Sequence, residues 1–200
     1  MLKTRTAAIP DAPLITAHRR AMFVAMGSGT PESLDEMCRH FEPWLLPRLA
    51  DGRYLGWITC DGARPIASAA LLFLDWPPHP LHPADSVRAY ILNVFVEPEY
   101  RRRGLARSLV QLCMDEARRR NIRVTMLHAS AEGRPVYELM GFSLSNEMQY
   151  VEPDIRRNPN GFPVFPPEST RPTIADDIVK EIEQQEFDPS VIHDRKPATG

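Results

Sequence analysis

The chain has 200 residues, which is enough for one domain with a hydrophobic core and an extension. Hydrophobic residues make up 43% of it and charged residues 25%, shares that are ordinary for a soluble globular protein. The formal net charge is −2, so the overall charge favours neither a nucleic acid nor a membrane surface as a partner, and any anion site has to be local.

Three widely spaced cysteines, Cys38, Cys60 and Cys113, show neither metal-site nor redox spacing, as expected of thiols in a reducing cytoplasm. The first residues are not followed by a long apolar run, so no signal peptide is expected. No segment has the roughly 18 uninterrupted apolar residues of a membrane span. The sequence therefore predicts a cytoplasmic protein without a membrane partner.

The first part of the chain predicts one strand and two helices. A strand over Thr4 to Ile9 precedes a helix that Asp11 caps and Gly27 ends. A second helix begins at Thr30-Pro31, because a proline at the first helical position loses no hydrogen bond there.

A hairpin and a central strand follow. Tyr54 to Cys60 and Ile66 to Leu74 have strand composition, and Asp61-Gly62 between them is a hairpin signal because both residues tolerate a positive φ. Arg88 to Val96 is a near-continuous apolar run, which is typical of a strand covered on both faces.

The second half alternates helices and strands. A third helix starts at Gly104 and ends with Asn121 in the left-handed cap position. A strand over Arg123 to Leu127, a short helix over Val136 to Met140 and a final strand over Phe142 to Val151 complete the pattern. The alternation, after a hairpin in the first half, predicts an α/β fold with a mixed sheet.

The composition changes after residue 152. Eight of the 20 prolines fall between Pro153 and Pro197. We therefore expect one domain over residues 1–152 and a proline-rich C-terminal extension over residues 153–200, with one helix at about residues 174–187. That helix packs either on the domain or on a second subunit, so a homodimer is one of two arrangements left open.

The loop after the central strand carries the chemical signal. Arg101-Arg102-Arg103-Gly104-Leu105-Ala106 places three cations and one glycine where a helix begins. The first amides of a helix have no partner inside it and the helix dipole adds positive charge, so such a start binds a phosphate or diphosphate. A solvated arginine cluster is the alternative interpretation. The glycines and lysine of the dinucleotide and P-loop motifs are missing.

Two motifs, in order and with one helix and one strand between them, resemble those of the GNAT superfamily of N-acetyltransferases. Arg101-x-x-Gly104-x-Ala106 is similar to the family's acetyl-CoA motif and follows Val96-Glu97-Pro98-Glu99-Tyr100, which matches the family's V-x-P-x-Y. Val136-Tyr137-Glu138-Leu139-Met140-Gly141-Phe142 resembles the family's L-Y-E-x-x-G-F. The resemblance covers roughly residues 4 to 151.

The resemblance implies a central, mostly antiparallel, twisted sheet flanked by helices. It also implies an acyltransferase that transfers groups other than aminoacyl groups, with acetyl-CoA as the acyl donor, a primary amine as the acceptor, direct attack in a ternary complex, and no metal. A small amine, an amino acid and a protein amine all remain open as the acceptor.

The resemblance further assigns the acetyl-CoA contacts. Exposed backbone groups of Val94, Phe95 and Val96 would hold the pantetheine and polarise the thioester carbonyl, where two neighbouring strands of the family splay apart. Ser130 stands where the family often has Asn, and Gly133 where Ala is usual, so both are carried over as cofactor contacts although Ser130 reaches less far. The loop that would bind the pyrophosphate comprises Arg101, Arg102, Arg103, Gly104, Leu105, Ala106 and Arg107.

Tyr137 matches the family tyrosine that lies near the cofactor sulfur and acts as general acid. A phenol, with a pKa of about 10, can protonate a departing thiolate; the alternative is that Tyr137 only packs. Glu97, at the end of the central strand, is the candidate general base, with a solvated carboxylate as the alternative. Asn93 can orient substrate or water, or be paired structurally, but it cannot be a base. His128 ends the next strand and is more often hydrogen-bonded structure than a base.

Two other functions stay open. A non-catalytic acyl-CoA-binding regulatory module would share the cofactor motif but not the chemistry. An RNA-binding protein would use Arg101 to Arg107 and Arg118 to Arg123, but the near-neutral net charge and the lack of an aromatic-studded basic face count against it. His79 and His82, without further ligands nearby in the sequence, are a poor metal site.

Overall fold

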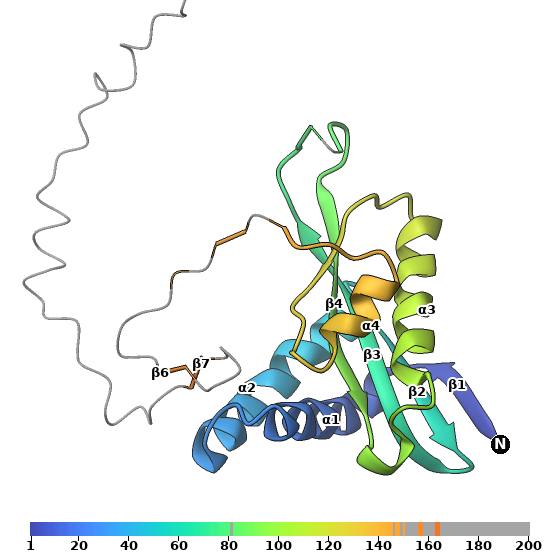
Figure 1. Ribbon diagram of the computed structural model, residues 1–200, viewed down its shortest axis with the longest axis vertical. Helices are drawn as coiled ribbons and strands as arrows, with labels where there is room; N and C mark the ends of the chain where they lie inside the picture. Colours follow the sequence, from blue (N-terminus) through green and yellow to red (C-terminus); the bar gives the residue numbers. More distant parts are fainter. Residues whose placement is uncertain (81, 146, 149, 151–155, 158–162, 165–200) are drawn as a thin grey trace, which may run out of the picture. The chain divides into compact units, whose positions relative to one another are not determined.

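The fold is that of a computed structural model, which describes residues 1–80, 82–145, 147, 148, 150, 156, 157, 163 and 164 (Figure 1). The chain divides into two units, Met1–Pro167 and Glu168–Gly200, and every described residue lies in the first. The boundary predicted after residue 152 and the helix predicted at about residues 174–187 lie outside the described residues.

The elements follow one another along the chain as strands, helices and two short 3-10 turns. In order they are β1 (Leu2–Thr6), η1 (Ile9–Asp11), α1 (Ala12–Ala25), α2 (Pro31–Ala50), β2 (Tyr54–Asp61), β3 (Arg64–Asp75), β4 (Val87–Val96), η2 (Pro98–Tyr100), α3 (Leu105–Arg119), β5 (Thr125–Leu127), α4 (Arg134–Leu139), β6 (Arg156–Arg157) and β7 (Pro163–Val164).

Five strands form one sheet in the order β1-β2-β3-β4-β5. The pairs from β1 to β4 are antiparallel, whereas β5 runs parallel to β4. The short strands β6 and β7 form a separate antiparallel pair. The main sheet is mixed, mostly antiparallel and flanked by helices, which confirms the predicted fold class.

Helices α1 and α2 cover one face of the sheet, and α3 covers the other (Figure 1). β4 therefore lies between two cores, which explains its near-continuous apolar sequence. The core under α1 and α2 is formed by Ala12, Ile15, Phe41, Leu45, Tyr54 and Ala70. The core under α3 is formed by Ala67, Ala69, Leu71, Ala89, Ile91, Leu109, Val110, Cys113 and Ala117.

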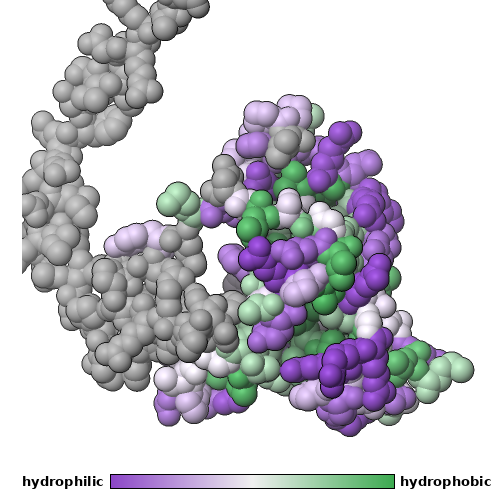
Figure 2. Space-filling model, viewed as in Figure 1, coloured by the Kyte–Doolittle hydropathy of each residue, from purple (hydrophilic) through white to green (hydrophobic). Residues whose placement is uncertain are grey.

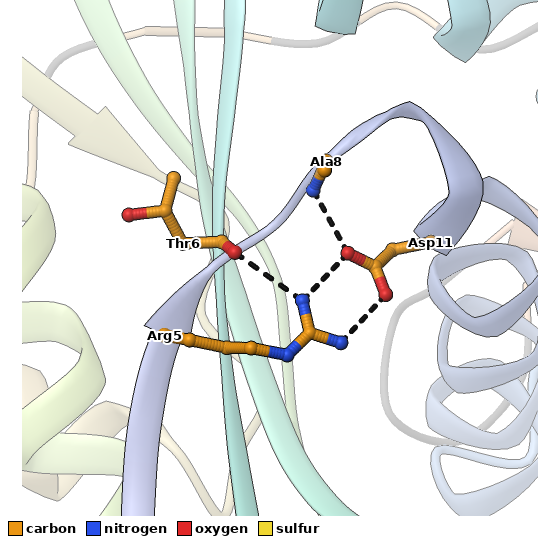
Figure 3. A network of polar contacts seen from close by, with 4 residues as sticks. All are labelled: Arg5, Thr6, Ala8 and Asp11. Carbon is orange, nitrogen blue, oxygen red and sulfur yellow. Dashed lines mark hydrogen bonds and ion pairs between the residues drawn. The ribbon is translucent and has the colours of Figure 1, made fainter.

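The starts of the two N-terminal helices differ in how they are capped. α2 begins as predicted, because the Thr30 hydroxyl accepts a hydrogen bond from the Ser33 amide (3.3 Å) and α2 opens with a proline. α1 does begin after Asp11, but that carboxylate does not cap it. Both Asp11 oxygens accept from Arg5 (2.7 Å each), and one also accepts from the Ala8 amide (2.8 Å; Figure 3). The side chain thus ties the end of β1 to η1.

β4 contains a bulge that its apolar sequence did not reveal. The pairing with β3 shifts between Ser68 and Ala70, so β4 carries one extra residue at Asn93. Asn93 has a φ of 55°, in the left-handed region that asparagine tolerates better than most residues. Because of the extra residue, Ile91 before the bulge and Val94 after it both face the core under α3.

The turn between β2 and β3 lies one residue later than predicted. Asp61 pairs with Arg64 and stays in the strand ladder, so the loop is Gly62-Ala63, and Gly62 supplies the positive φ (59°). At the end of α3 the predicted left-handed cap is confirmed. Asn121 has a φ of 58° and its amide donates to the Arg118 carbonyl (2.9 Å).

The predicted final strand over Phe142 to Val151 is wrong for its described residues, which are 142–145, 147, 148 and 150 and none of which is in a strand. The Phe142 amide instead donates to the Tyr137 carbonyl (3.0 Å), and the two rings lie 6.0 Å apart, so this residue closes α4 rather than starting a strand. Smaller differences are that β1 and α4 begin two residues before the predicted ranges and β5 two residues after.

Candidate active site

β4 and β5 are paired over only part of their length. Their parallel pairing joins Ala89–Ile91 to Thr125–Leu127 and ends there. β4 continues to Val96, held by β3 on its other side. The edge of Val94–Val96 that faces away from β3 therefore has no strand partner among the described residues, and its backbone groups can meet a ligand.

The start of α3 leaves several amides open. Gly104 precedes the helix with a φ of 78°, and the first helical hydrogen bond runs from the Ser108 amide to the Gly104 carbonyl (3.0 Å). Within the described ranges, nothing accepts a hydrogen bond from the amides of Leu105, Ala106 and Arg107. A Cβ built on Gly104 would meet nothing within 4 Å. Figure 2 shows hydrophilic residues gathered where α3 begins. Open amides at the start of a helix favour an anion as their ligand.

The arginines around this helix start do two different things. Arg101 Nε donates to the Val96 carbonyl (3.1 Å), and Arg103 donates to a backbone carbonyl of the same loop (2.9 Å), so these two side chains brace the loop. Arg102 and Arg107 are exposed, and no described residue forms an ion pair or hydrogen bond with either side chain. These two are the cations available to a phosphate.

Ser130, Gly133 and Tyr137 lie together beside the core under α3. The Gly133 amide donates to the Ser130 hydroxyl (3.0 Å). A Cβ on Gly133 would come within 3.0 Å of the Tyr137 ring and 3.2 Å of the Ser130 hydroxyl, which explains glycine where the family usually has alanine. Burial raises the pKa of the Tyr137 hydroxyl, with the nearby Cys113 as a second cause.

Glu97 follows β4 and is half-buried. Its amide donates to the Ile66 carbonyl (2.9 Å), which fixes its backbone beside β3. In the part of the chain that the structure describes, no hydrogen bond or ion pair engages its carboxylate. The structure therefore places Glu97 next to the open segment of β4 but does not join it to Tyr137.

A polar network surrounds the bulge, and sequence reasoning missed most of it. The Asn93 amide group donates to the Tyr54 hydroxyl (2.9 Å), and its oxygen accepts from Arg19 Nη1 (2.6 Å). His18 Nδ1 shares a hydrogen bond with the Ser68 hydroxyl (2.9 Å). The signal in the sequence was Asn93, a polar residue in an apolar strand; His18 follows the apolar spacing of α1 and looks like a core position.

Burial controls the ionisation of this network. Loss of solvent lowers the pKa of His18 and of Arg19, and it raises the pKa of Tyr54. His18 is therefore held as the neutral imidazole and Tyr54 as the neutral phenol. Arg19 stays charged, because an arginine starts from a pKa above about 12.

Other predicted residues have structural partners. The Tyr90 hydroxyl hydrogen-bonds Nδ1 of His128, in line with a structural role for that histidine. His82 uses both ring nitrogens, one with the Asp85 carbonyl (3.2 Å) and one with Arg88 Nε (3.3 Å), which leaves neither for a metal. The described residues hold no group of three or more potential metal ligands. Of the helices that the structure describes, none is both long and apolar enough to span a membrane.

Most arginines of the basic segment at the end of α3 are paired within the helix. Arg118 pairs with Asp115 (2.7 Å), while Arg119 and Arg120 both pair with Glu116 (2.7 Å each). Hydrogen bonding from Arg119 is the largest cause that lowers the pKa of Glu116 to about 2. These arginines are therefore already matched, which weakens the RNA-binding interpretation.

One hollow of the described region lies away from these residues. It measures about 500 Å³ and lies at the opposite end of α3 from Gly104. Its walls include Arg53, Asp85 and Arg120, so they carry both signs of charge. It contains none of the residues predicted to bind acetyl-CoA or to act in catalysis.

Residues 17–142 match the model of the acetyltransferase (GNAT) family. A GCN5-related N-acetyltransferase from Ralstonia eutropha JMP134 is 40% identical, with a TM-score of 0.73 and coverage of 76% of this chain and 98% of that one. A predicted acetyltransferase from Clostridium acetobutylicum, solved with acetyl-CoA, is 28% identical, with a TM-score of 0.71 and coverage of 76% and 96%.

A glucosamine-6-phosphate N-acetyltransferase from Arabidopsis thaliana is 18% identical, with a TM-score of 0.55 and coverage of 77% of this chain and 99% of that one. At this identity the likeness concerns the fold alone. No curated protein sequence matches the chain.

Proposed function

This chain belongs to the GNAT family and is an acetyl-CoA-dependent N-acetyltransferase, and on that premise we propose that it passes the acetyl group directly to a primary amine while donor and acceptor are bound together. Tyr137 acts as the general acid and Glu97 as the general base. The proposed donor contacts are Val94, Phe95, Val96, Arg101, Arg102, Arg103, Gly104, Leu105, Ala106, Arg107, Ser130, Gly133 and Tyr137.

The start of α3 is the observation that carries the proposal. Three amides without acceptors and two arginines without partners among the described residues converge there with an open Gly104. The diphosphate of acetyl-CoA needs hydrogen-bond donors and positive charge, and this helix start offers both. Arg102 and Arg107 would supply the charge, while Arg101 and Arg103 hold the shape of the loop.

The open edge of β4 supports the placement of the pantetheine. Beyond Ile91 the strand has lost β5 as a neighbour, so Val94–Val96 have no strand partner on that side among the described residues, although the Val96 carbonyl accepts a hydrogen bond from Arg101. The amides of the pantetheine can pair with such an edge much as an added strand does. This would direct the thioester toward the bulge and the space between the splayed strands.

The β4 backbone and Tyr137 then act at different steps of the transfer. Acetyl-CoA supplies an activated thioester carbonyl. A backbone N–H of Val94–Val96 donates to the carbonyl oxygen as the amine nitrogen attacks and negative charge develops. When the C–S bond breaks, the Tyr137 hydroxyl gives its proton to the sulfur. The raised pKa of Tyr137 keeps the phenol protonated until that moment.

Two further protons have to move. An alkyl ammonium must lose one before it can attack, and Glu97 accepts it and releases it to solvent. The nitrogen loses a second proton after attack, which returns through water to the Tyr137 phenolate. The products are then the neutral amide and the free thiol, and both side chains have regained their starting states.

A non-catalytic acyl-CoA-binding module is the second candidate. It would use the same anion site and the same strand edge. The hydroxyl of Tyr137 favours catalysis, because it forms no hydrogen bond with any residue that the structure describes and so is free to donate.

Calorimetry and thiol release test the proposal together. Acetyl-CoA should bind the purified chain, and at least one member of a panel of amines should release free thiol and yield an acetamide. Failure to bind acetyl-CoA would overturn the proposal. Binding without turnover of any amine would instead support the non-catalytic module.

A further inference from the structure

Arg19 of α1 is a half-buried cation that has no matching anion among the described residues. Its Nη1 donates to the Asn93 side-chain oxygen (2.6 Å) at the bulge of β4. Its Nε is buried and has no acceptor, and it is the one buried side-chain polar atom in this state among the residues described. Its Nη2 also donates to no described residue but is not among the buried atoms, so the edge formed by Nε and Nη2 borders solvent at Nη2.

The surroundings of Arg19 are aromatic rather than acidic. The guanidinium lies 4.9 Å from the centre of the Phe23 ring and 4.7 Å from that of Phe41. No described carboxylate comes within ion-pair distance of it. Asp35, one of the acids on the neighbouring helix α2, pairs with Arg20 instead (2.8 Å).

A purely structural role leaves this arrangement unexplained. Holding the bulge requires one N–H directed at Asn93, which a neutral donor could provide. Removing the charge of Arg19 from water is costly, and the bond to Asn93 and the two aromatic rings offset that cost less fully than a partner of opposite charge would. Arg19 uses one N–H donor, on Nη1, to hold the bulge. Nε and Nη2 lie on one edge of the planar guanidinium, and neither donates to a described residue.

We propose that Arg19 binds a carboxylate of the acceptor, so that the enzyme acetylates the amine of an amino acid or a similar amino carboxylate. This inference rests on the proposed function, because the bulge residue that holds Arg19 directly precedes the segment assigned to the thioester. The Nε/Nη2 edge matches the two oxygens of a carboxylate, and the phenylalanine rings on either side exclude water and strengthen the pairing.

Matched acceptor pairs test the inference. The acceptors form a series of amino acids with increasing numbers of carbons between the amine and the carboxylate. Each amino acid is compared with its neutral carboxamide, and kcat/KM is measured by thiol release. In the best pair, kcat/KM for the acid should exceed kcat/KM for its carboxamide on the order of 100-fold, as expected when one partner of a buried charge pair is lost. Equal rates for acids and carboxamides would overturn the inference and leave the proposed function standing.

Two variants separate recognition from packing. Arg19→Met keeps an apolar chain between the two rings and should lose the preference for acids while it still binds acetyl-CoA. Arg19→Lys keeps the charge but not the fork, and should retain part of the preference. Arg20→Met is the matched control, because its side chain is 39% exposed and paired with Asp35; its preference should equal that of the parent protein. A preference kept by Arg19→Met would refute the assignment.

Binding alone gives an independent readout. With coenzyme A present, calorimetric titration should detect the preferred amino acid in the parent protein and in Arg20→Met, but at least tenfold more weakly in Arg19→Met. If acetyl-CoA binds and no acid of the series is either bound or acetylated, the inference fails on its own. If acetyl-CoA itself does not bind, the proposed function fails first and the inference with it.

Discussion

Removing only the hydroxyl oxygen of Tyr137 tests its role in catalysis without changing how its ring packs. Its ring packs against the core under α3 and near Phe142, and Phe keeps all of those contacts. Tyr137→Phe should therefore bind acetyl-CoA within about twofold of the parent, while turnover falls on the order of 100-fold or more because the leaving sulfur lacks its acid. Thiol release measured beside calorimetry decides this, and an unchanged turnover would remove Tyr137 from the mechanism.

His18 makes a prediction about stability and pH. Its ring is buried against Ser68 and lies 4.9 Å from the Phe95 ring, and burial lowers its pKa below the ordinary value of about 6.5. Around and below that value the unfolded chain binds more protons at this residue than the folded chain. The free energy of unfolding should therefore fall as the pH drops from about 6.5 toward the lowered pKa.

Urea unfolding measured across this pH range tests the prediction about His18. The parent protein should lose stability between pH 7 and about pH 5, and His18→Gln should lose less of it. The exposed His40 offers the control, because His40→Gln should follow the parent curve. Identical pH dependence in parent and His18→Gln would show that other groups set the acid sensitivity.

At the scale of elements, the loop before α3 can be tested with a matched pair of glycines. Gly104 and Gly52 have φ values of 78° and 76°, and at both a new Cβ would meet nothing within 4 Å. Changing either to alanine should cost about 1–2 kcal/mol from backbone strain. Gly104→Ala should in addition weaken acetyl-CoA binding at least tenfold, because the Cβ stands over the amides that would hold the diphosphate. Equal affinities in the two variants would contradict an anion site at α3.

The elements that the sequence predicts well are those fixed by local chemistry. The Thr30-Pro31 start of α2 and the left-handed Asn121 after α3 depend on neighbouring residues only, and both are as expected. Asp11 differs, because Arg5 of β1 competes for its carboxylate. The bulge at Asn93 depends on pairing with β3, and no local pattern records a register shift between strands.

In the candidate site, too, features fixed by neighbouring residues are predictable and features that join distant elements are not. The helix start at Gly104 has a short, local motif, and the structure gives it the open amides that the motif predicts. The network of His18, Arg19 and Asn93 joins α1 to the bulge across many intervening residues. Each of its members alone resembles a packing or solvated residue, so the network becomes visible only when the helix is placed over the sheet.

Charge over the whole molecule explains why the anion site can be local. The net charge is −2, and the arginines at the end of α3 are paired with Asp115 and Glu116. Arg102 and Arg107 at its start have no such partners in the described ranges. Under the proposed function, this distribution of charge favours a diphosphate at one end of α3 over polyanion binding along the whole helix.

The last prediction concerns how much of the chain the activity needs. The Ralstonia eutropha protein is covered over 98% of its length by 76% of this chain, so a complete fold of this kind does not require a counterpart to the remainder. All described residues lie in the unit Met1–Pro167. A chain ending at Pro167 should therefore keep its cooperative thermal unfolding, its affinity for acetyl-CoA within about twofold, and the preference between matched acceptors.

Calorimetry and thiol release compare the chain that ends at Pro167 with the full chain. Loss of acetyl-CoA binding with unfolding unchanged would mean that residues 168–200 contribute to the donor site, whereas loss of cooperative unfolding would mean that the first unit depends on them for its stability.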